Sequence, residues 1–260
     1  MKRSILNFSL GVLSFFLFFS CLDDDNDIYV SYGVIKNATS SNNYEILTDK
    51  GNTLVVTKSH TGQTIENDKR VLVNYELLSD KNQNKNVYEI QVNGFYSLLS
   101  KPLVNESFIL QKEDARRDSI GNDPFIAISA RFGGDYVNIN FELLYKQGSD
   151  VKHMINLVYD DTRASADTIY LRLYHNAYDE VPGKGLFLYK DLGRCSFKIS
   201  DLMPEGVTSK PIRLTWIEYN HNYEPVERSG TDVFKLGNAS EKDKNFERAT
   251  TGFNDNVRVN

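Results

Sequence analysis

The 260-residue sequence is poor in cysteine, tryptophan and histidine. It contains two cysteines, one tryptophan and four histidines. The cysteines are Cys21, at the end of an apolar N-terminal run, and Cys195, far along the chain. If Cys21 is modified at that position, Cys195 has no partner and no intrachain disulfide can form. The fold must then be stabilised by packed apolar cores, which domains of about 100 residues can build unaided.

Excess basic charge and catalytic motifs are also lacking. The chain has 30 basic and 35 acidic residues and a net charge of −5, which argues against a nucleic-acid partner. It has no G-x-S-x-G nucleophile elbow and no Gly-rich phosphate loop. No pair among the histidines has the spacing of a zinc site (His60, His153, His175 and His221). These absences predict a protein without catalytic residues, metal or cofactor. His153 and His175 have the inward parity of their strands and Cys195 lies in an alternating strand, so all three are expected to belong to the core.

The N-terminus has the pattern of a bacterial lipoprotein signal. Lys2 and Arg3 precede an apolar run from Ile5 to Phe19, which is shorter than the roughly 18 residues of a membrane-spanning helix. Ser20 and Cys21 then resemble a lipobox, in which the cysteine is lipidated and becomes the mature N-terminus. We therefore expect residues 1–20 to be a signal peptide and Cys21 to carry the lipid that anchors the protein to a membrane.

Acidic residues follow the cysteine directly, and residues 21–27 are interpreted as a tether. Composition alone supports a solvated, flexible segment. Acid at this place also resembles the export signal that carries some lipoproteins across the outer membrane (Asp23, Asp24 and Asp25). The second interpretation predicts an outer-membrane lipoprotein exposed at the cell surface.

Hydrophobic alternation with a period of two predicts an all-β protein. Within residues 28–100, five short alternating segments without helical period favour an OB-like, five-stranded barrel. Residues 101–123 break the alternation with a charge cluster and are interpreted as an interdomain linker. Residues 124–236 contain seven more alternating segments, which predict a seven-stranded antiparallel β-sandwich. Residues 237–260 are polar and are expected to be a mobile tail.

Three stretches carry a family resemblance. DSIGNDP at 118–124, GGDYVNINF at 133–141 and HMINLV at 153–158, together with the lipobox and the barrel pattern, resemble the NigD-like lipoproteins. That family joins an N-terminal OB domain to a C-terminal β-sandwich, and the resemblance covers roughly residues 1–236. It implies no catalytic residues. Its name comes from association with a bacteriocin locus.

Two places in the sandwich region are candidates for ligand or partner contact. The segment from Ala177 to Tyr189 combines Tyr178, Asp179 and Glu180 with glycines, as binding loops on rigid scaffolds do. Leu186–Tyr189 within it can alternatively be a short buried strand. Trp216 has the parity of a core residue, which leaves Tyr219 and Tyr223 as the surface aromatics of that region.

We therefore expect a lipid-anchored, two-domain protein of the cell envelope that is not an enzyme. Its role is binding or that of an accessory factor, with a glycan or a protein as partner. One alternative is an envelope hydrolase that uses acidic residues of the sandwich, such as Asp160–Asp161 or Asp179–Glu180. Another is a structural subunit of a surface assembly, which a long unpaired edge strand would favour.

Overall fold

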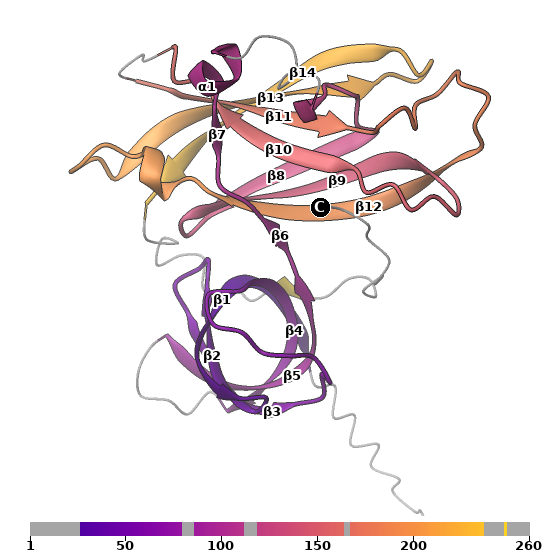
Figure 1. The fold of residues 1–260 in the computed structure, drawn as a ribbon. Coiled ribbons are helices and arrows are strands. Elements are labelled where there is room, and N and C mark those ends of the chain that lie inside the picture. Colours follow the sequence, from indigo (N-terminus) through magenta and orange to yellow (C-terminus); the bar gives the residue numbers. More distant parts are fainter. Residues whose placement is uncertain (1–26, 80–85, 112–118, 164–166, 237–246, 249–260) are drawn as a thin grey trace, which may run out of the picture.

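The chain folds into a small β-barrel and a larger β-sandwich, which lie one below the other in Figure 1. The computed structural model describes residues 27–79, 86–111, 119–163, 167–236 and 247–248. The predicted signal peptide, Cys21 and Asp23–Asp25 lie outside these residues, as does most of the predicted tail. None of the helices in the described ranges is long and apolar enough to cross a membrane.

The barrel is closed by five strands. They are β1 (Ile28–Ser40), β2 (Asn43–Thr48), β3 (Thr53–Ser59), β4 (Arg70–Ser79) and β5 (Val87–Ser97). They pair in the order β1-β2-β3-β5-β4, and β1 also pairs with β4, so the sheet closes on itself. β3 and β5 run parallel. Residues 60–69, between β3 and β4, contain no helix.

Alternating apolar side chains fill the barrel interior, because successive residues of a strand point to opposite faces. Tyr44 and Ile46 on β2 and Val71, Val73 and Tyr75 on β4 are all buried. A short strand outside the barrel, β15 (Glu247–Arg248), pairs with the start of β1. The part of the predicted tail that the structure describes is therefore bound to the barrel.

The sandwich consists of two sheets around one apolar core. The first sheet has the order β14-β13-β11-β10-β7 and the second has the order β6-β12-β9-β8. The bounds are β6 (Leu99–Ser100), β7 (Val104–Asn105), β8 (Ala127–Gly133), β9 (Tyr136–Lys146), β10 (Met154–Tyr159), β11 (Ile169–Asn176), β12 (Leu188–Lys198), β13 (Ser209–Tyr219) and β14 (Pro225–Lys235). A 3-10 helix, η1 (Ser200–Leu202), follows β12.

All seven predicted strands of the sandwich are present, β8 to β14, and two short strands are added. The interpretation of residues 101–123 as a plain linker needs correction. Within this range β7 pairs in parallel with β10, and α1 (Glu106–Leu110) follows directly. β6 lies just before the range, at the end of the segment predicted as the barrel, and pairs in parallel with β12 of the other sheet. β11 and β13 are also parallel, so the sandwich is mixed rather than purely antiparallel.

The core between the sheets is formed by the inward residues of the alternating strands. Phe125, Phe141, Phe197 and Phe234 are fully buried there, and Cys195 is buried beside them. Burial raises the pKa of the Cys195 thiol, so it remains protonated and unreactive. Trp216 packs against the same core, as its parity predicts.

A buried arginine connects the barrel to the sandwich. Arg70, at the start of β4, has a side chain that is 2% exposed and forms an ion pair with Asp49 in the β2–β3 turn. Its Nε donates to Ser196 Oγ on β12 (2.9 Å), and Nη2 donates to Asn138 Oδ1 on β9 (2.9 Å). Its guanidinium lies 4.1 Å from the ring centre of Tyr136. The two bodies are thus joined by a buried hydrogen-bond network.

Candidate functional site

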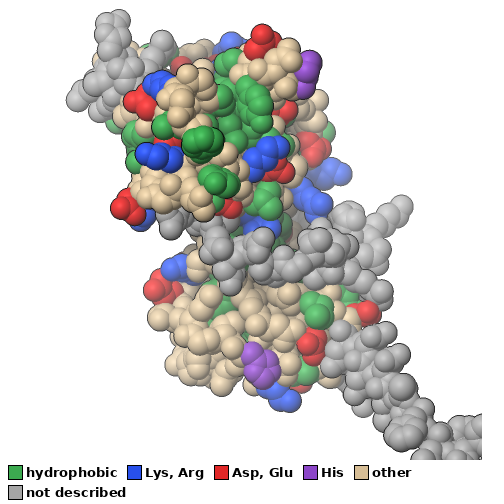
Figure 2. Space-filling view, turned by 90° about the vertical axis from the view of Figure 1, so that its right-hand side faces the viewer, with side chains coloured by type: hydrophobic (Ala, Val, Ile, Leu, Met, Phe, Trp, Pro, Cys, Tyr) green, Lys and Arg blue, Asp and Glu red, His purple; other side chains and the backbone are tan. Residues whose placement is uncertain are grey.

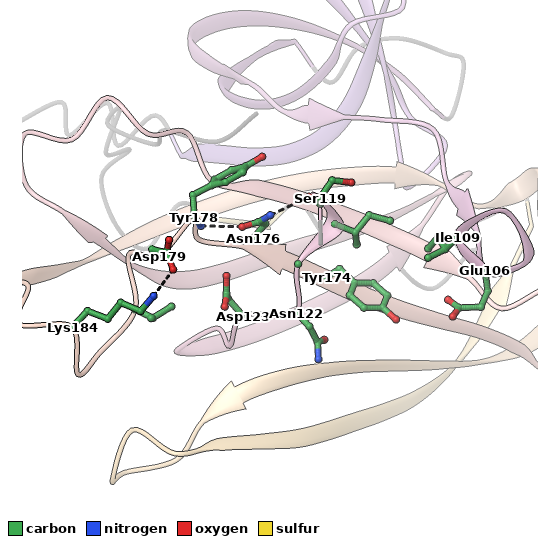
Figure 3. A pocket seen from close by; sticks show the side chains of 13 residues that line it. Glu106, Ile109, Ser119, Asn122, Asp123, Tyr174, Asn176, Tyr178, Asp179 and Lys184 are labelled. Atoms are coloured by element: carbon green, nitrogen blue, oxygen red, sulfur yellow. Dashed lines mark hydrogen bonds and ion pairs between the residues drawn. The ribbon is translucent and has the colours of Figure 1, made fainter. Parts of the chain in front are cut away.

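A cavity of about 830 Å³ opens on the outer face of the five-stranded sheet, beside α1 (Figure 3). In Figure 1 this face of the sandwich is the one turned away from the barrel. The cavity is lined by residues of α1, of the segment 119–123, of β11 and of the loop after β11. Four separate parts of the chain therefore build one site.

The segment 119–123 is held tightly against β11. Gly121 has a φ of +72°, and a Cβ at this position would lie 2.5–2.6 Å from atoms of Asn176 and from the carbonyl of His175. Asn176 Nδ2 donates to the carbonyl of Ser119 (3.1 Å), and the Asp123 amide donates to the carbonyl of His175 (2.7 Å). This wall of the cavity needs glycine at position 121.

The opposite wall is a loop with unusual backbone angles. Tyr178 and Asp179 both have positive φ, 48° and 75°. Such conformations cost energy for residues with a Cβ and concentrate at functional sites. The Tyr178 amide donates to Asn176 Oδ1 (2.9 Å), the Ala177 amide donates to Asp123 Oδ2 (2.7 Å), and Asp179 forms an ion pair with Lys184. The loop is therefore fixed at its base, and Figure 3 shows Tyr178 and Asp179 beside the cavity.

The third wall is the short helix α1, which is capped by a carboxylate from a neighbouring loop. Asp161 Oδ1 accepts the amide of Ser107 (2.8 Å), and its Oδ2 accepts the Ser107 hydroxyl. These hydrogen bonds hold the pKa of Asp161 below its usual value. The helix buries Ile109 against Ile120 and Val158 and places Glu106 at the rim of the cavity.

Two buried histidines, His175 on β11 and His153 just before β10, lie on the core side of the five-stranded sheet. His153 Nδ1 and His175 Nε2 are 2.9 Å apart, and His153 Nε2 is 3.3 Å from Glu180 Oε2. The His175 ring also stacks on Phe125 at 4.8 Å. Burial, together with the neighbouring His153, lowers the pKa of His175 to about 3, so its imidazole is neutral near pH 7. Both histidines are buried, as their parity predicts.

The structure separates the predicted contact residues. Tyr178 and Asp179 line the cavity. The prediction for Glu180 needs correction, because this residue is 6% exposed and its carboxylate accepts the Lys146 amide (2.8 Å) and contacts His153. Hydrogen bonds and the histidine keep the pKa of Glu180 low despite its burial. Glu180 therefore supports the loop from inside.

Tyr219 and Tyr223 lie at the β13–β14 hairpin and pack edge to face, with ring centres 6.0 Å apart. Burial and the nearby Asp123 carboxylate raise the pKa of Tyr219 to about 12. Asp123 lines the cavity, whereas Tyr219 does not. Because Tyr219 interacts with Asp123, it lies near the cavity.

The alternative of a buried strand at Leu186–Tyr189 is also corrected. β12 begins at Leu188, but Phe187 is 89% exposed and Tyr189 is 46% exposed.

In Figure 2, hydrophobic side chains gather on the sandwich part of the face shown, whereas few are visible on the barrel part.

Of the residues that line the cavity, sequence reasoning identified only Tyr178 and Asp179, and it missed polar lining residues such as Asn122, Tyr174 and Asn176. Tyr174 and Asn176 alternate with the buried Leu173 and His175, so their outward direction can be read from the strand pattern. What the pattern does not show is that α1 and the segment 119–123 come to lie against this face.

A separate junction cavity, of about 510 Å³, lies between the barrel and the sandwich. Its lining includes Leu47 and Asp49 of the barrel and Tyr136 and Lys198 of the sandwich. None of the predicted contact residues belongs to it.

The chemistry of the outer cavity suits a polar ligand. It offers a carboxylate (Glu106), an amide (Asn122) and tyrosine side chains (Tyr174 and Tyr178), whereas the Asn176 amide is bonded to Ser119 and Tyr178. Among the described residues, no group of three or more His, Cys, Asp or Glu side chains is placed to hold a metal ion. The arrangement can donate and accept hydrogen bonds and can provide flat aromatic contact.

Two family models match the chain. Residues 32–98 match the NigD-like N-terminal OB domain, and residues 107–228 match the NigD-like C-terminal beta sandwich domain. No curated protein shows a significant match to this sequence.

Solved structures share the fold at low sequence identity. A candidate toxin-related protein from Parabacteroides distasonis ATCC 8503 is 23% identical with a TM-score of 0.60, covering 80% of this chain and 94% of its own. A NigD-like immunity protein from Bacteroides caccae ATCC 43185 is 19% identical with a TM-score of 0.58, covering 77% and 90%. A candidate lipoprotein from Bacteroides fragilis NCTC 9343 is 12% identical with a TM-score of 0.57, covering 82% and 100%. At these identities the likeness shows the fold alone.

Proposed function

Because this chain belongs to the NigD-like family, in which an OB domain precedes a β-sandwich, we propose that it is a lipid-anchored cell-envelope protein that acts by binding. The lipid is carried by Cys21, and the acidic residues after it direct the protein to the outer surface of the outer membrane. The binding site is the cavity beside α1. The similar fold of a candidate lipoprotein from Bacteroides fragilis supports the anchoring.

The observation that carries the binding role is the pair Tyr178 and Asp179. Both were expected to contact a ligand on sequence grounds, both line the cavity, and both adopt strained backbone angles. The loop is held by side chains on its buried side, Asp123 and Asn176. A rigid, polar cavity of this size is within the range of ligand sites, about 300–1,000 Å³.

The acidic residues considered for a hydrolase have other partners. Asp161 caps α1, and Asp160 accepts from Thr162 and pairs with Arg163. Asp179 pairs with Lys184, and Glu180 faces His153. Hydrolysis of a glycosidic bond needs one carboxyl group with a raised pKa, whereas the pKa values of Asp161 and Glu180 are lowered. These contacts favour binding over hydrolysis.

The exposed edge of the five-stranded sheet is the feature that would favour a structural subunit of a surface assembly. β14 is an edge strand of 11 residues. It carries Glu227, Arg228 and Asp232, all of them exposed, and charges on an edge strand oppose pairing with a second sheet. These charges favour a protein that presents a site over one that polymerises through its sheet edge.

The anchoring is tested by incorporation of a labelled fatty acid in cells. The Cys21→Ala variant should lose the label and leave the membrane fraction. Cys195→Ala is the matched control, because Cys195 is buried in the sandwich core, and it should be labelled like the wild type. Unchanged labelling of Cys21→Ala would refute the proposed anchor.

The binding role is tested by hydrogen exchange on the purified chain mixed with envelope extract, separated into polysaccharide and protein fractions. Bound ligand should protect amides in residues 119–123 and 177–184. Tyr178→Ala should abolish this protection, and Tyr189→Ala should not. The two side chains are 44% and 46% exposed, and only Tyr178 lines the cavity. Absence of protection with both fractions would overturn the binding role of this cavity.

A further inference from the structure

We propose that the ligand is a linear, uncharged oligosaccharide. It lies in a groove formed by the cavity beside α1, called the first cavity, and a smaller one next to it, called the second cavity. The inference rests on the proposed function and specifies the class of ligand. The second cavity, of about 240 Å³, lies on the same outer sheet face, over β11, β13 and β14. Glu106 and Tyr174 line both cavities, so the two meet at these side chains.

One strand forms the floor of the whole groove. Tyr170, Arg172 and Tyr174 on β11 alternate with the buried residues Leu171, Leu173 and His175, so they point outward. Asn176 has the same parity and lines the first cavity, but it is only 8% exposed. At about 3.3 Å per residue, the stretch from Tyr170 to Asn176 spans roughly 20 Å along the strand. A groove of this length fits an extended chain better than a single small molecule.

Arg172 connects the two cavities. Its side chain lines the second cavity, and its Nη2 donates to Oδ1 of Asn122, which lines the first, at 3.5 Å. The guanidinium lies over the ring of Tyr174 at 5.3 Å, and Nη1 donates to Glu227 Oε2 at 2.9 Å. Its Nε is buried and has no hydrogen-bond partner among the described residues. The position of this guanidinium is thus fixed before a ligand arrives.

The charges of the second cavity balance. Three arginines line it (Arg163, Arg172 and Arg213), and so do three carboxylates (Glu106, Asp160 and Glu227). A phosphate or other polyanion gains little where carboxylates of equal number surround it. Guanidinium groups only donate hydrogen bonds and carboxylates only accept them, whereas a sugar hydroxyl does both. A row of hydroxyl groups therefore matches this mixed lining.

A peptide fits the groove less well. An extended peptide needs partners for its backbone N–H and C=O groups, and it commonly finds them at the edge of a sheet. The floor of the groove belongs to β11 and β13, which are paired on both sides. A sheet face presents side chains, because the backbone N–H and C=O groups of its strands point sideways within the sheet toward neighbouring strands. The carbohydrate proposal follows from this floor.

The test measures the affinity of the purified chain for neutral linear oligosaccharides of two and six sugar units from glucan, mannan and xylan series. One series should bind, and its hexamer should bind about tenfold or more tightly than its dimer. Tyr178→Ala in the first cavity and Arg213→Ala in the second should each weaken hexamer binding by roughly tenfold, the effect of losing one good hydrogen bond. Arg213 is exposed, so its removal leaves the fold intact.

Arg228→Ala is the matched control for Arg213→Ala, because Arg228 is an exposed arginine on β14 that lines neither cavity. It should bind like the wild type. If only Tyr178→Ala weakens binding, the continuous groove is refuted and the binding function stands. If the cavity is protected by the protein fraction alone and no oligosaccharide binds, the carbohydrate inference is overturned while the binding function stands. If no fraction and no oligosaccharide affects the cavity, both fail.

Discussion

The buried imidazole of His175 makes the stability of the protein depend on pH. Its pKa is about 3 in the folded chain, against an ordinary value of 6.5, chiefly because of burial and secondly because of His153. Above pH 6.5 the imidazole is neutral in both the folded and the unfolded chain. Between pH 6.5 and 3 it is protonated only in the unfolded chain. Unfolding then takes up a proton, so the free energy of unfolding falls as the pH falls.

The size of this effect follows from the difference in pKa. Each pH unit within the window costs up to about 1.4 kcal/mol of stability. Integrated from pH 8 to pH 5, the loss from this single group is roughly 2 kcal/mol, a large fraction of the 5–15 kcal/mol typical of folded domains. The pKa of Glu180, which contacts His153, is lowered, so its contribution is lost only in more acidic solution, as the pH falls through its folded value.

The assay is urea denaturation at pH 8, 7, 6 and 5, with the free energy of unfolding plotted against pH for the wild type and His175→Gln. Glutamine can still hydrogen-bond to His153 but does not titrate. The wild type should lose about 2 kcal/mol more than the variant across this range. His221→Gln is the control, because His221 is exposed on the β13–β14 turn, and it should follow the wild type. Parallel curves for wild type and His175→Gln would refute the argument.

Three other predictions follow from the fold and the N-terminus. Arg70→Met should lower the free energy of unfolding by about 3–5 kcal/mol, because it leaves the Asp49 carboxylate, which is only 12% exposed, without its ion pair, and a smaller loss in urea denaturation would contradict this. Gly193→Ala should lower the midpoint of unfolding, because a Cβ would lie 2.0 Å from the ring of Phe141, and the added change Phe141→Leu should restore part of the loss. A chain with three alanines after Cys21 should keep its lipid but resist protease added to whole cells, and continued cleavage would contradict surface export (Asp23→Ala, Asp24→Ala and Asp25→Ala).

The long strands could be predicted from the sequence because burial of one face imposes alternation. Val71, Val73 and Tyr75 in the barrel and Ile139 and Phe141 in the sandwich show this directly. The two-residue strands β6 and β7 and the five-residue helix α1 are too short to impose any period. β6 and β7 form where the chain runs from the barrel past β12 of one sheet and then β10 of the other. This course of the chain is visible only in the folded structure.

The candidate site was found only in part for a related reason. Tyr178 and Asp179 could be identified because a loop with acids and glycines after a strand is a common binding element. Glu180 was misplaced, because sequence does not show that its carboxylate turns inward to His153. Arg70 could not be identified as a connecting residue, because its partners Asn138 and Ser196 lie on strands of the other body.

The Arg70 network also limits how the chain can be divided. A separately expressed barrel would leave the Arg70 guanidinium without its bonds to Asn138 and Ser196. A separate sandwich would keep the bond between Ser196 and Asn138 but would lose the arginine that both of them accept from. Transplanting either module onto another anchor would therefore require redesign of this junction. The portable unit is the pair of modules together, and recombination between relatives that exchanges one module must exchange a compatible junction with it.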